Sequence, residues 1–315
     1  MNFQIDLVFP YVNNFDTVWQ KTYEKYCEEH NLNKMINAMN KERFRANPYL
    51  PFVFRGIEKF MPFIRKVFLI VSNIEQVPEW VNQEIVQVVL HKDFIPEQYL
   101  PTYNSTTIEM FLPEIKGLSD YFIYANDDMY VINSTTPEDY FTDDGYPKLN
   151  LIRHGQNRVN SQYWEVCYKL YTDISNKLGI NPLETGEFVT PGHNYSPINK
   201  QQALQVKELL GDLIPNSITN FRTNYNYNQY IYAIYPYLTG KYEPSTRTAR
   251  YIAMNKQKAN IVASTISGGA NKELILNDVE DTDLVYWKRN ATIVKEAFLK
   301  KLPNKSIYEK RDVFL

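Results

Sequence analysis

Two adjacent carboxylates, Asp127 and Asp128, are the residues best suited to chemistry, and they follow an apolar run that begins at residue 122 with FIYAN. Like charges side by side repel each other, and burial strengthens the repulsion. The pair is tolerated in a solvated turn or beside a cation, and hard divalent cations take oxygen ligands. Glu109, on an expected helix that returns to the same strand, favours the metal site over the plain turn.

Basic side chains offer partners for phosphate groups. Arg43 and Arg45 project from the same side of an expected extended segment, and Arg55 and Lys92 follow. Guanidinium groups match phosphate oxygens with two parallel hydrogen bonds, although arginine is also common on any surface. Arg222, in NFRTNYNYNQ, lies among Asn and Gln side chains, which is unusual company for a packing residue.

His193 is the histidine most suited to proton transfer. It lies in TPGHNYSP, where a Pro-Gly turn presents it from a loop. Imidazole accepts a proton near neutral pH, although a single loop histidine is more often inert. His91 and His154 are secondary candidates.

The first half of the chain predicts alternating strands and helices that position these side chains. Short apolar runs predict strands covered on both faces, at 5–12, 67–72, 86–91 and 121–125. The helices expected between them are 16–30, 50–61 and 105–112, the last capped by Asn104. Each strand stops at polar groups, and ligands of open parallel α/β sheets bind at the carboxyl ends of strands. The four strand ends together favour a ligand site.

The second half is expected to be more helical. Helices are predicted at 158–178, 199–211, 226–239 and 288–301, and an exposed loop at 264–273. From these residues alone, the sequence predicts an α/β enzyme with a metal and phosphate site at the carboxyl edge of its sheet.

Composition narrows the class of protein. The 315 residues carry a formal net charge of −2, so whole-chain attraction to nucleic acid is not expected. Two cysteines, Cys27 and Cys167, are too few for a disulfide scaffold or a thiolate metal cage. No secretory leader and no membrane-spanning run is recognised, so we expect a cytoplasmic protein. Most of the 25 tyrosines are expected in the core or on the surface, although tyrosine also stacks on sugars.

Several blocks, in order along nearly the whole chain, resemble the Stealth family. They are IDLVFPYVNNFDTVW, RFRANPYLPFVFRGIEKFMPFIRKVFLIVSN, HKDFIPEQYLPTYNSTTIE, GLSDYFIYANDDMYV, TPGHNYSPINK, FRTNYNYNQYIYAIYPYLTGK, LILNDVEDTD and FLKKLPNKSIYE. Stealth proteins are bacterial capsular polysaccharide phosphotransferases, similar to the catalytic core of the animal GlcNAc-1-phosphotransferase.

The resemblance implies a fold and a reaction. The fold is a Rossmann-like α/β domain over 1–315, resembling nucleotide-sugar transferases, with a mixed sheet in 1–150 and a more helical part in 151–315 that completes the active site. The reaction transfers a hexose-1-phosphate or HexNAc-1-phosphate from a UDP-sugar to a glycan hydroxyl, releases UMP and requires Mg²⁺ or Mn²⁺. The expected acceptor, a lipid-linked oligosaccharide or polysaccharide, would bring the protein to the inner face of the membrane.

The resemblance also assigns roles by position. The implied metal ligands are Glu109, Asp127 and Asp128, and the implied catalytic residues are His193, Arg222 and Asp278. His193 would be the base or would position the acceptor hydroxyl. The implied donor-binding residues are Asn13, Asp16, Arg43, Arg45, Lys92, Asn104 and Asn126.

The first block departs from the family. It reads FPYVNNFD where the family shows a Tyr-Thr-Trp-Val-Asp/Asn-Gly-Ser/Asp-Asp run, which leaves the donor sugar open. Two other functions remain open as well. A metal-dependent glycosyltransferase that releases UDP would carry a similar acidic strand end, and a glycan-binding protein without turnover would also be rich in tyrosine.

Overall fold

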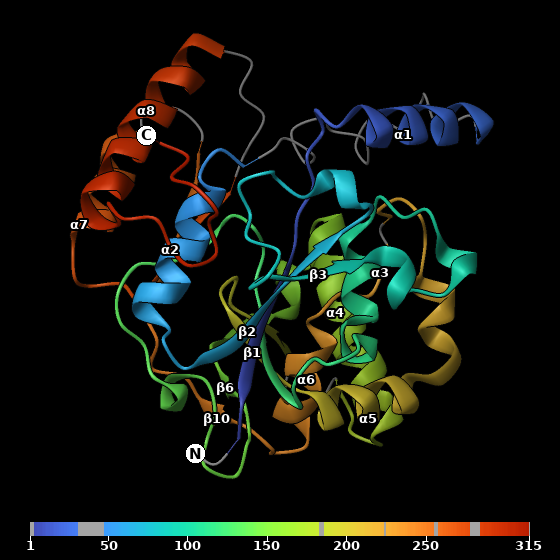
Figure 1. Cartoon of the computed structure of the whole chain (residues 1–315). Coiled ribbons are helices and arrows are strands. Elements are labelled where there is room, and N and C mark those ends of the chain that lie inside the picture. Colours follow the sequence, from blue (N-terminus) through green and yellow to red (C-terminus); the bar gives the residue numbers. More distant parts are fainter. Residues whose placement is uncertain are drawn as a thin grey trace.

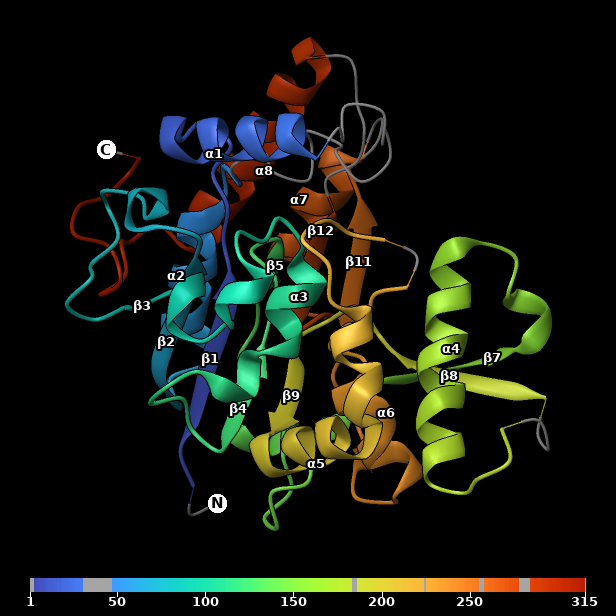
Figure 2. The same ribbon diagram turned by 90° about the vertical axis from the view of Figure 1, so that its right-hand side faces the viewer.

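The structure is a computed structural model, and it describes residues 3–30, 47–182, 186–223, 225–254, 258–277 and 284–314. Its centre is a five-stranded sheet, counted over these residues, in the order β3-β2-β1-β4-β9 (β1 to β3 are labelled in Figure 1 and all five strands in Figure 2). The strands are β1 (Ile5–Pro10), β2 (Ile64–Val71), β3 (Gln87–Leu90), β4 (Tyr121–Tyr124) and β9 (Ser196–Asn199). The first four in chain order run parallel to one another, and β9 is antiparallel to β4.

The strands are apolar because helices cover both faces of the sheet. Along β1, Leu7 and Phe9 belong to one buried cluster and Val8 belongs to the other, as the alternation of a strand requires. The first cluster contains residues of α2 (Leu50–Phe60), α7 (Ala259–Ser267) and α8 (Leu284–Lys301). The second contains residues of α3 (Ser105–Met110), α4 (Gln162–Lys177), α5 (Lys200–Leu210) and α6 (Ile231–Leu238). Both clusters therefore combine residues from the two halves of the chain.

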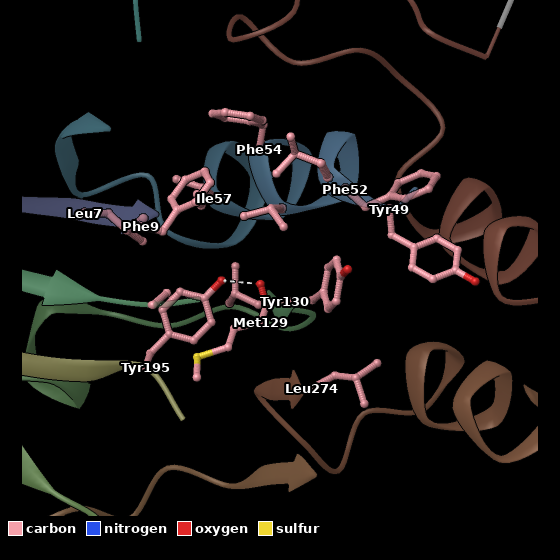
Figure 3. Packing of buried hydrophobic residues seen from close by; sticks show 14 of the residues in the cluster. Leu7, Phe9, Tyr49, Phe52, Phe54, Ile57, Met129, Tyr130, Tyr195 and Leu274 are labelled. Carbon is pink, nitrogen blue, oxygen red and sulfur yellow. Dashed lines mark hydrogen bonds between the residues drawn. The ribbon is translucent and has the colours of Figure 1, made fainter. Parts of the chain in front are cut away.

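A smaller sheet continues from the end of β4. Over the described residues it has the order β11-β12-β5, formed by β11 (Ala249–Ala253), β12 (Glu273–Asn277) and β5 (Met129–Val131) (Figure 2). Tyr251 pairs with Ile275, which in turn pairs with Met129. Met129 and Tyr130 of β5 belong to the same buried cluster as Phe9 and residues of α2, and Figure 3 shows the hydrogen bond that the Tyr195 hydroxyl donates to the Met129 carbonyl. The sheet fixes the turn that carries Asp127 and Asp128.

Helix α1 (Thr17–Glu29) lies beyond the carboxyl ends of the parallel strands (Figures 1 and 2). Asp16 caps it by accepting hydrogen bonds from the Val18 and Trp19 N–H groups. Its Tyr23 ring packs edge-on against Tyr103 and Phe221, with ring centroids 5.0 and 5.8 Å apart. The helix is thus joined to the two segments that carry Asn104 and Arg222.

Arg55 does not face the carboxyl edge of the sheet, so its candidacy as a phosphate ligand is wrong. Its buried guanidinium group donates to both carboxylate oxygens of Glu309, each at 2.9 Å, and to Asp312 at 2.9 Å. It also donates to the carbonyls of Leu302 and Pro303. Five donors in a planar fork suit such a cluster of acceptors. Arg55 therefore anchors the C-terminal segment to α2.

The predicted elements of the first half are confirmed, with boundaries moved by a few residues. The helix predicted at 16–30 is α1, and the helix predicted at 50–61 is α2. The helix predicted at 105–112 is α3, which ends at Met110 before a separate 3₁₀ turn. The mixed α/β class is confirmed too, and α4, α5, α6 and α8 correspond to the four helices expected in the second half, whereas α7 was not predicted. Cys27 and Cys167 are buried and free.

Two predictions in the second half are wrong in part. Half of the loop expected at 264–273 is regular structure, because α7 runs to Ser267 and β12 begins at Glu273. The hydroxyls of Ser264 and Thr265 both donate to the Ile261 carbonyl, so these polar residues stay within the helix. The helix expected at 226–239 begins only at Ile231.

Candidate active site

The turn between β4 and β5 carries the paired carboxylates. It is closed by a hydrogen bond from the Met129 N–H to the Asn126 carbonyl, 3.2 Å long. The Asn47 side chain donates to the Asp127 carbonyl, and the Leu276 N–H donates to the Asp128 carbonyl at 3.0 Å. The backbone of the pair is therefore held by two other parts of the chain, while both side chains are half-buried.

Burial and the neighbouring charge of Asp128 raise the pKa of Asp127 to about 8. This is the physical sign of two carboxylates that repel each other in a partly dry site. A cation beside them would relieve the repulsion, so the donor chemistry of the pair fits a hard divalent metal such as Mg²⁺ or Mn²⁺.

Glu109 lies buried on α3, beside the end of β4. Its Oε1 accepts a hydrogen bond from the Tyr124 hydroxyl at 3.1 Å, and its Oε2 accepts from the Gln229 N–H at 2.9 Å. Burial raises the pKa of Glu109, and the Gln229 N–H, the charge of Arg222 and the Tyr124 hydroxyl oppose the rise. The Tyr124 hydroxyl also lies 2.9 Å from Asn126 Oδ1. Tyr124 therefore joins Glu109 to the turn of the paired carboxylates.

No group of three or more His, Cys, Asp or Glu side chains within the described ranges lies in an arrangement that could hold a metal ion. The structure thus does not gather Glu109, Asp127 and Asp128 into one set of ligands. Their assignment to a metal stays a prediction. Asp278, implied to complete the site, lies outside the described residues, as do Arg43 and Arg45.

Arg222 is exposed and donates a hydrogen bond to the hydroxyl of Ser105, the first residue of α3. Its positive charge acts on Glu109, Tyr124 and His193. The charge of this one arginine therefore lowers the pKa of three groups: Glu109 of α3, Tyr124 at the end of β4 and His193 in the loop before β9. A guanidinium group placed in this way can bind phosphate oxygens.

Buried amides explain the Asn-rich sequence around Arg222. Asn104 donates to the Thr219 carbonyl and to Asn226 Oδ1, both at 3.2 Å. Asn226 donates in turn to the Ser217 carbonyl at 2.6 Å. Buried polar groups of this kind are satisfied by one another, which fixes the segments that carry them. The Arg222 loop is thereby fastened to the N-terminal end of α3.

His193 lies in the loop between β8 (Glu187–Pro191) and β9, half-buried. Its ring packs edge-on against Tyr251, with ring centroids 5.7 Å apart and planes at 80°. Burial and the positive charge of Arg222 lower the pKa of His193 below its ordinary value of 6.5. The imidazole is therefore neutral at pH 7, which is the form that accepts a proton.

The remaining donor-side candidates lie on several elements of the fold. Asn13 and Asp16 are joined through Gln76, whose side chain donates to the Asn13 carbonyl at 3.0 Å and to Asp16 Oδ2 at 2.7 Å. Lys92 is exposed after β3, and two strands separate β3 from β4. Asn104 caps α3, as predicted, and both ends of its amide bond to the protein. Donor binding by these residues stays a prediction.

Three residues of the site were not singled out from the sequence. Tyr124 was hidden in the apolar run of β4, and Gln229 contributes its backbone N–H, which leaves no trace in the side-chain pattern. Tyr251 lies on β11, which the sequence did not predict as a strand. The sequence did contain one indication of Tyr124, because a tyrosine with a polar hydroxyl ends the otherwise apolar strand β4.

The described elements define a mixed α/β protein with parallel strands at its centre and two adjacent carboxylates, Asp127 and Asp128, in the turn where β4 ends. Residues 43–149 match the family described as Stealth protein CR2, conserved region 2. A capsular polysaccharide phosphotransferase of Neisseria meningitidis serogroup A is 31% identical over 98% of this chain, and 57% of that relative is covered. An exopolysaccharide phosphotransferase of Lactiplantibacillus plantarum is 27% identical over 98% of this chain and 97% of the relative. These matches confirm the resemblance to the Stealth family.

The chain spans little more than half the length of the Neisseria relative. Among solved structures, it is similar to the galactosyltransferase LgtC in complex with donor and acceptor sugar analogues, at 13% identity and a TM-score of 0.42. That comparison covers 92% of this chain and 95% of the other. Mouse xyloside xylosyltransferase 1 is similar at 10% identity and a TM-score of 0.40, over 86% of this chain and 97% of the other.

Proposed function

We propose that this protein transfers a hexose-1-phosphate or HexNAc-1-phosphate from a UDP-sugar to a hydroxyl of a glycan acceptor in bacterial capsular or cell-surface polysaccharide synthesis. The named phosphotransferases among its relatives support the proposal. The observation that carries it is the position of Arg222, whose charge acts on both Glu109 and His193. The proposal thereby assigns to Arg222, Glu109 and His193 the roles of a cation for phosphate, a carboxylate and a base.

His193 is the proposed base. Its lowered pKa keeps the imidazole neutral at pH 7, so it can accept the proton of the acceptor hydroxyl. The acceptor oxygen then forms a bond to the phosphorus that carries the sugar. The bond from this phosphorus to the oxygen shared with the uridine-bearing phosphate breaks, and UMP leaves with the electron pair.

Arg222 is the proposed phosphate ligand. Its exposed guanidinium group is anchored by one hydrogen bond to Ser105, so its other N–H groups can donate to phosphate oxygens. In phosphoryl transfer the protein mainly positions the reactants and neutralises charge, since little covalent chemistry is required of it.

Asp127, Asp128 and Glu109 are the residues that would hold Mg²⁺ or Mn²⁺. A bound divalent ion would neutralise diphosphate charge and polarise the phosphorus–oxygen bond. The chain's own contribution is to hold the Asp127–Asp128 backbone rigidly through Asn47 and Leu276.

We further propose a cytoplasmic protein that meets a lipid-linked oligosaccharide at the inner face of the membrane. No helix within the described ranges is long and apolar enough to cross a membrane. Contact with the membrane would therefore involve the surface of these residues, other parts of the protein or partner proteins.

The identity of the released nucleotide tests the proposed reaction. The purified protein is incubated with UDP-GlcNAc, UDP-Glc or UDP-Gal, Mg²⁺ and a simple sugar acceptor, and the nucleotides are separated by chromatography. Release of UMP is expected, because the bond between the two phosphates breaks. Release of UDP would replace the proposal with a glycosyltransferase, which the same carboxylate pair would also suit.

A further inference from the structure

We propose that the ring of Tyr251 is a stacking platform for a pyranose ring of the acceptor glycan. This inference rests on the proposed function and adds to it the site and the class of the acceptor. The sugar would present its apolar C–H face to the tyrosine and one of its hydroxyls to His193.

The surroundings of Tyr251 place it beside the reacting groups. Its ring contacts the His193 imidazole edge-on, at 5.7 Å between centroids. The register across the small sheet aligns Tyr251 with Ile275 and Ile275 with Met129, the residue directly after Asp128. Tyr251 therefore contacts the proposed base and lies in the same small sheet as the residue that follows the paired carboxylates.

Tyr251 also keeps an accessible surface. It is 50% exposed, although it contacts the half-buried His193. Burial, and then the charge of Asp128, raise the pKa of Tyr251, which agrees with a ring packed on one side near that carboxylate. A large ring that is half open beside a catalytic group presents apolar surface where a sugar can bind.

The chemistry of the neighbours favours the acceptor over the donor diphosphate. Tyr251 contacts His193, the proposed base, which must meet the acceptor hydroxyl whose proton it takes. Arg222, the proposed phosphate ligand, acts on His193 from another segment of the chain. The sugar over Tyr251 is thus the one whose hydroxyl loses its proton to His193.

The test compares Tyr251→Ala and Tyr251→Phe with a control, Tyr146→Ala. Tyr146 is 38% exposed, and its backbone N–H and carbonyl bond to Thr142, so Tyr146→Ala reports the effect of deleting an exposed tyrosine elsewhere. Methyl β-glucopyranoside, methyl β-galactopyranoside and methyl N-acetyl-β-glucosaminide serve as acceptor probes. We expect Tyr251→Ala to raise the acceptor KM about 10-fold, with the donor KM within about twofold of wild type. Tyr251→Phe and Tyr146→Ala should keep both values.

Binding is measured separately from turnover. Saturation-transfer NMR of the same methyl glycosides should show contacts to the sugar ring protons in wild type and Tyr251→Phe, and lose them in Tyr251→Ala. Unchanged NMR contacts in Tyr251→Ala overturn the inference, even for a protein that transfers nothing. A rise confined to the donor KM of Tyr251→Ala also overturns the inference. A fall in kcat of Tyr251→Ala at constant acceptor KM overturns it too, because the ring would then only orient His193. Absence of UMP release from wild type instead contradicts the proposed reaction.

Discussion

The Tyr124 hydroxyl lies 3.1 Å from Glu109 Oε1 and 2.9 Å from Asn126 Oδ1, and so connects the buried carboxylate of α3 to the turn after β4. Two elements that carry predicted metal ligands are thereby joined by one side chain. The contact is possible because the last residue of β4 points its ring toward α3, where Glu109 is fully surrounded by protein.

Tyr124→Phe should therefore affect both stability and function. The variant removes the hydroxyl and leaves a buried carboxylate oxygen without that donor, at a cost of about 1–3 kcal/mol in the free energy of unfolding. Urea denaturation measures this cost. We also expect a higher metal concentration for half-maximal activity, because Glu109 loses a group that orients it.

Tyr232→Phe is the matched control for this prediction. The Tyr232 hydroxyl donates to the backbone carbonyls of Glu109 and Met110, at 3.0 and 3.2 Å, and leaves the Glu109 carboxylate untouched. It should lower stability by a similar amount with unchanged metal dependence. Equal metal dependence in Tyr124→Phe and Tyr232→Phe would show that Tyr124 supports only the fold.

Asp128→Asn should abolish turnover and leave the fold intact. The substitution removes one of two adjacent carboxylates and with it the strongest reason for a cation to bind there. In wild type, Mg²⁺ or Mn²⁺ should raise the thermal midpoint, since a ligand that binds only the folded state stabilises it. The variant should lose this shift. Asp144→Asn, in an exposed turn, is the control, and an Asp128→Asn enzyme of normal activity would contradict the metal assignment.

Much of the parallel sheet could be predicted because its signal is local. Strands β1 to β4 are short apolar runs, and the rule for the carboxyl ends of parallel strands pointed to the turn at Asp127 and Asp128 before any contact was known. The small sheet gave no such signal. Strand β5 has three residues, and its partner β12 lies more than a hundred positions further along the chain. Pairing of this kind depends on tertiary structure, which local patterns do not report.

The site itself required more than spacing. Nothing local in the sequence relates Arg222 to Glu109 or His193, and their roles came from the ordered blocks of the family resemblance. The structure adds a physical connection between the Arg222 loop and α3, through the buried amides of Asn104 and Asn226. The same amides explain why the helix expected from residue 226 starts later, since Asn226 is engaged with Ser217 and Thr219.

Arg55→Met should destabilise the protein by about 3–5 kcal/mol, because removal of one partner leaves a buried charge uncompensated. The side chains of Arg55 and Glu309 are 1% and 0% exposed. Arg311→Met is the matched control, since Arg311 pairs with Glu79 at 3.7 Å and these side chains are 73% and 93% exposed. Exposed pairs contribute about 1 kcal/mol or less. Denaturant unfolding of both variants decides the point, and a loss in Arg55→Met no larger than in Arg311→Met would contradict the anchoring role.

His193→Ala should lower turnover by at least ~10²-fold if His193 is a general base. A loss confined to the apparent affinity for the acceptor would instead make His193 a binding residue. The pH dependence gives a second, independent measurement. Since the pKa of His193 is lowered, the base should remain neutral and active below pH 6.5, its ordinary value.

Arg222→Gln should raise the pKa of His193. A positive charge disfavours the imidazolium form, so its removal makes protonation easier, while burial continues to hold the pKa down. NMR titration of the ring protons measures this without turnover, and with 4 histidines in the chain the His193 signal is assigned from its absence in His193→Ala. Arg311→Gln, an exposed arginine paired with Glu79, is the control and should leave the titration unchanged. A His193 signal that titrates identically in Arg222→Gln and wild type would separate the two residues and remove the electrostatic argument for a shared site.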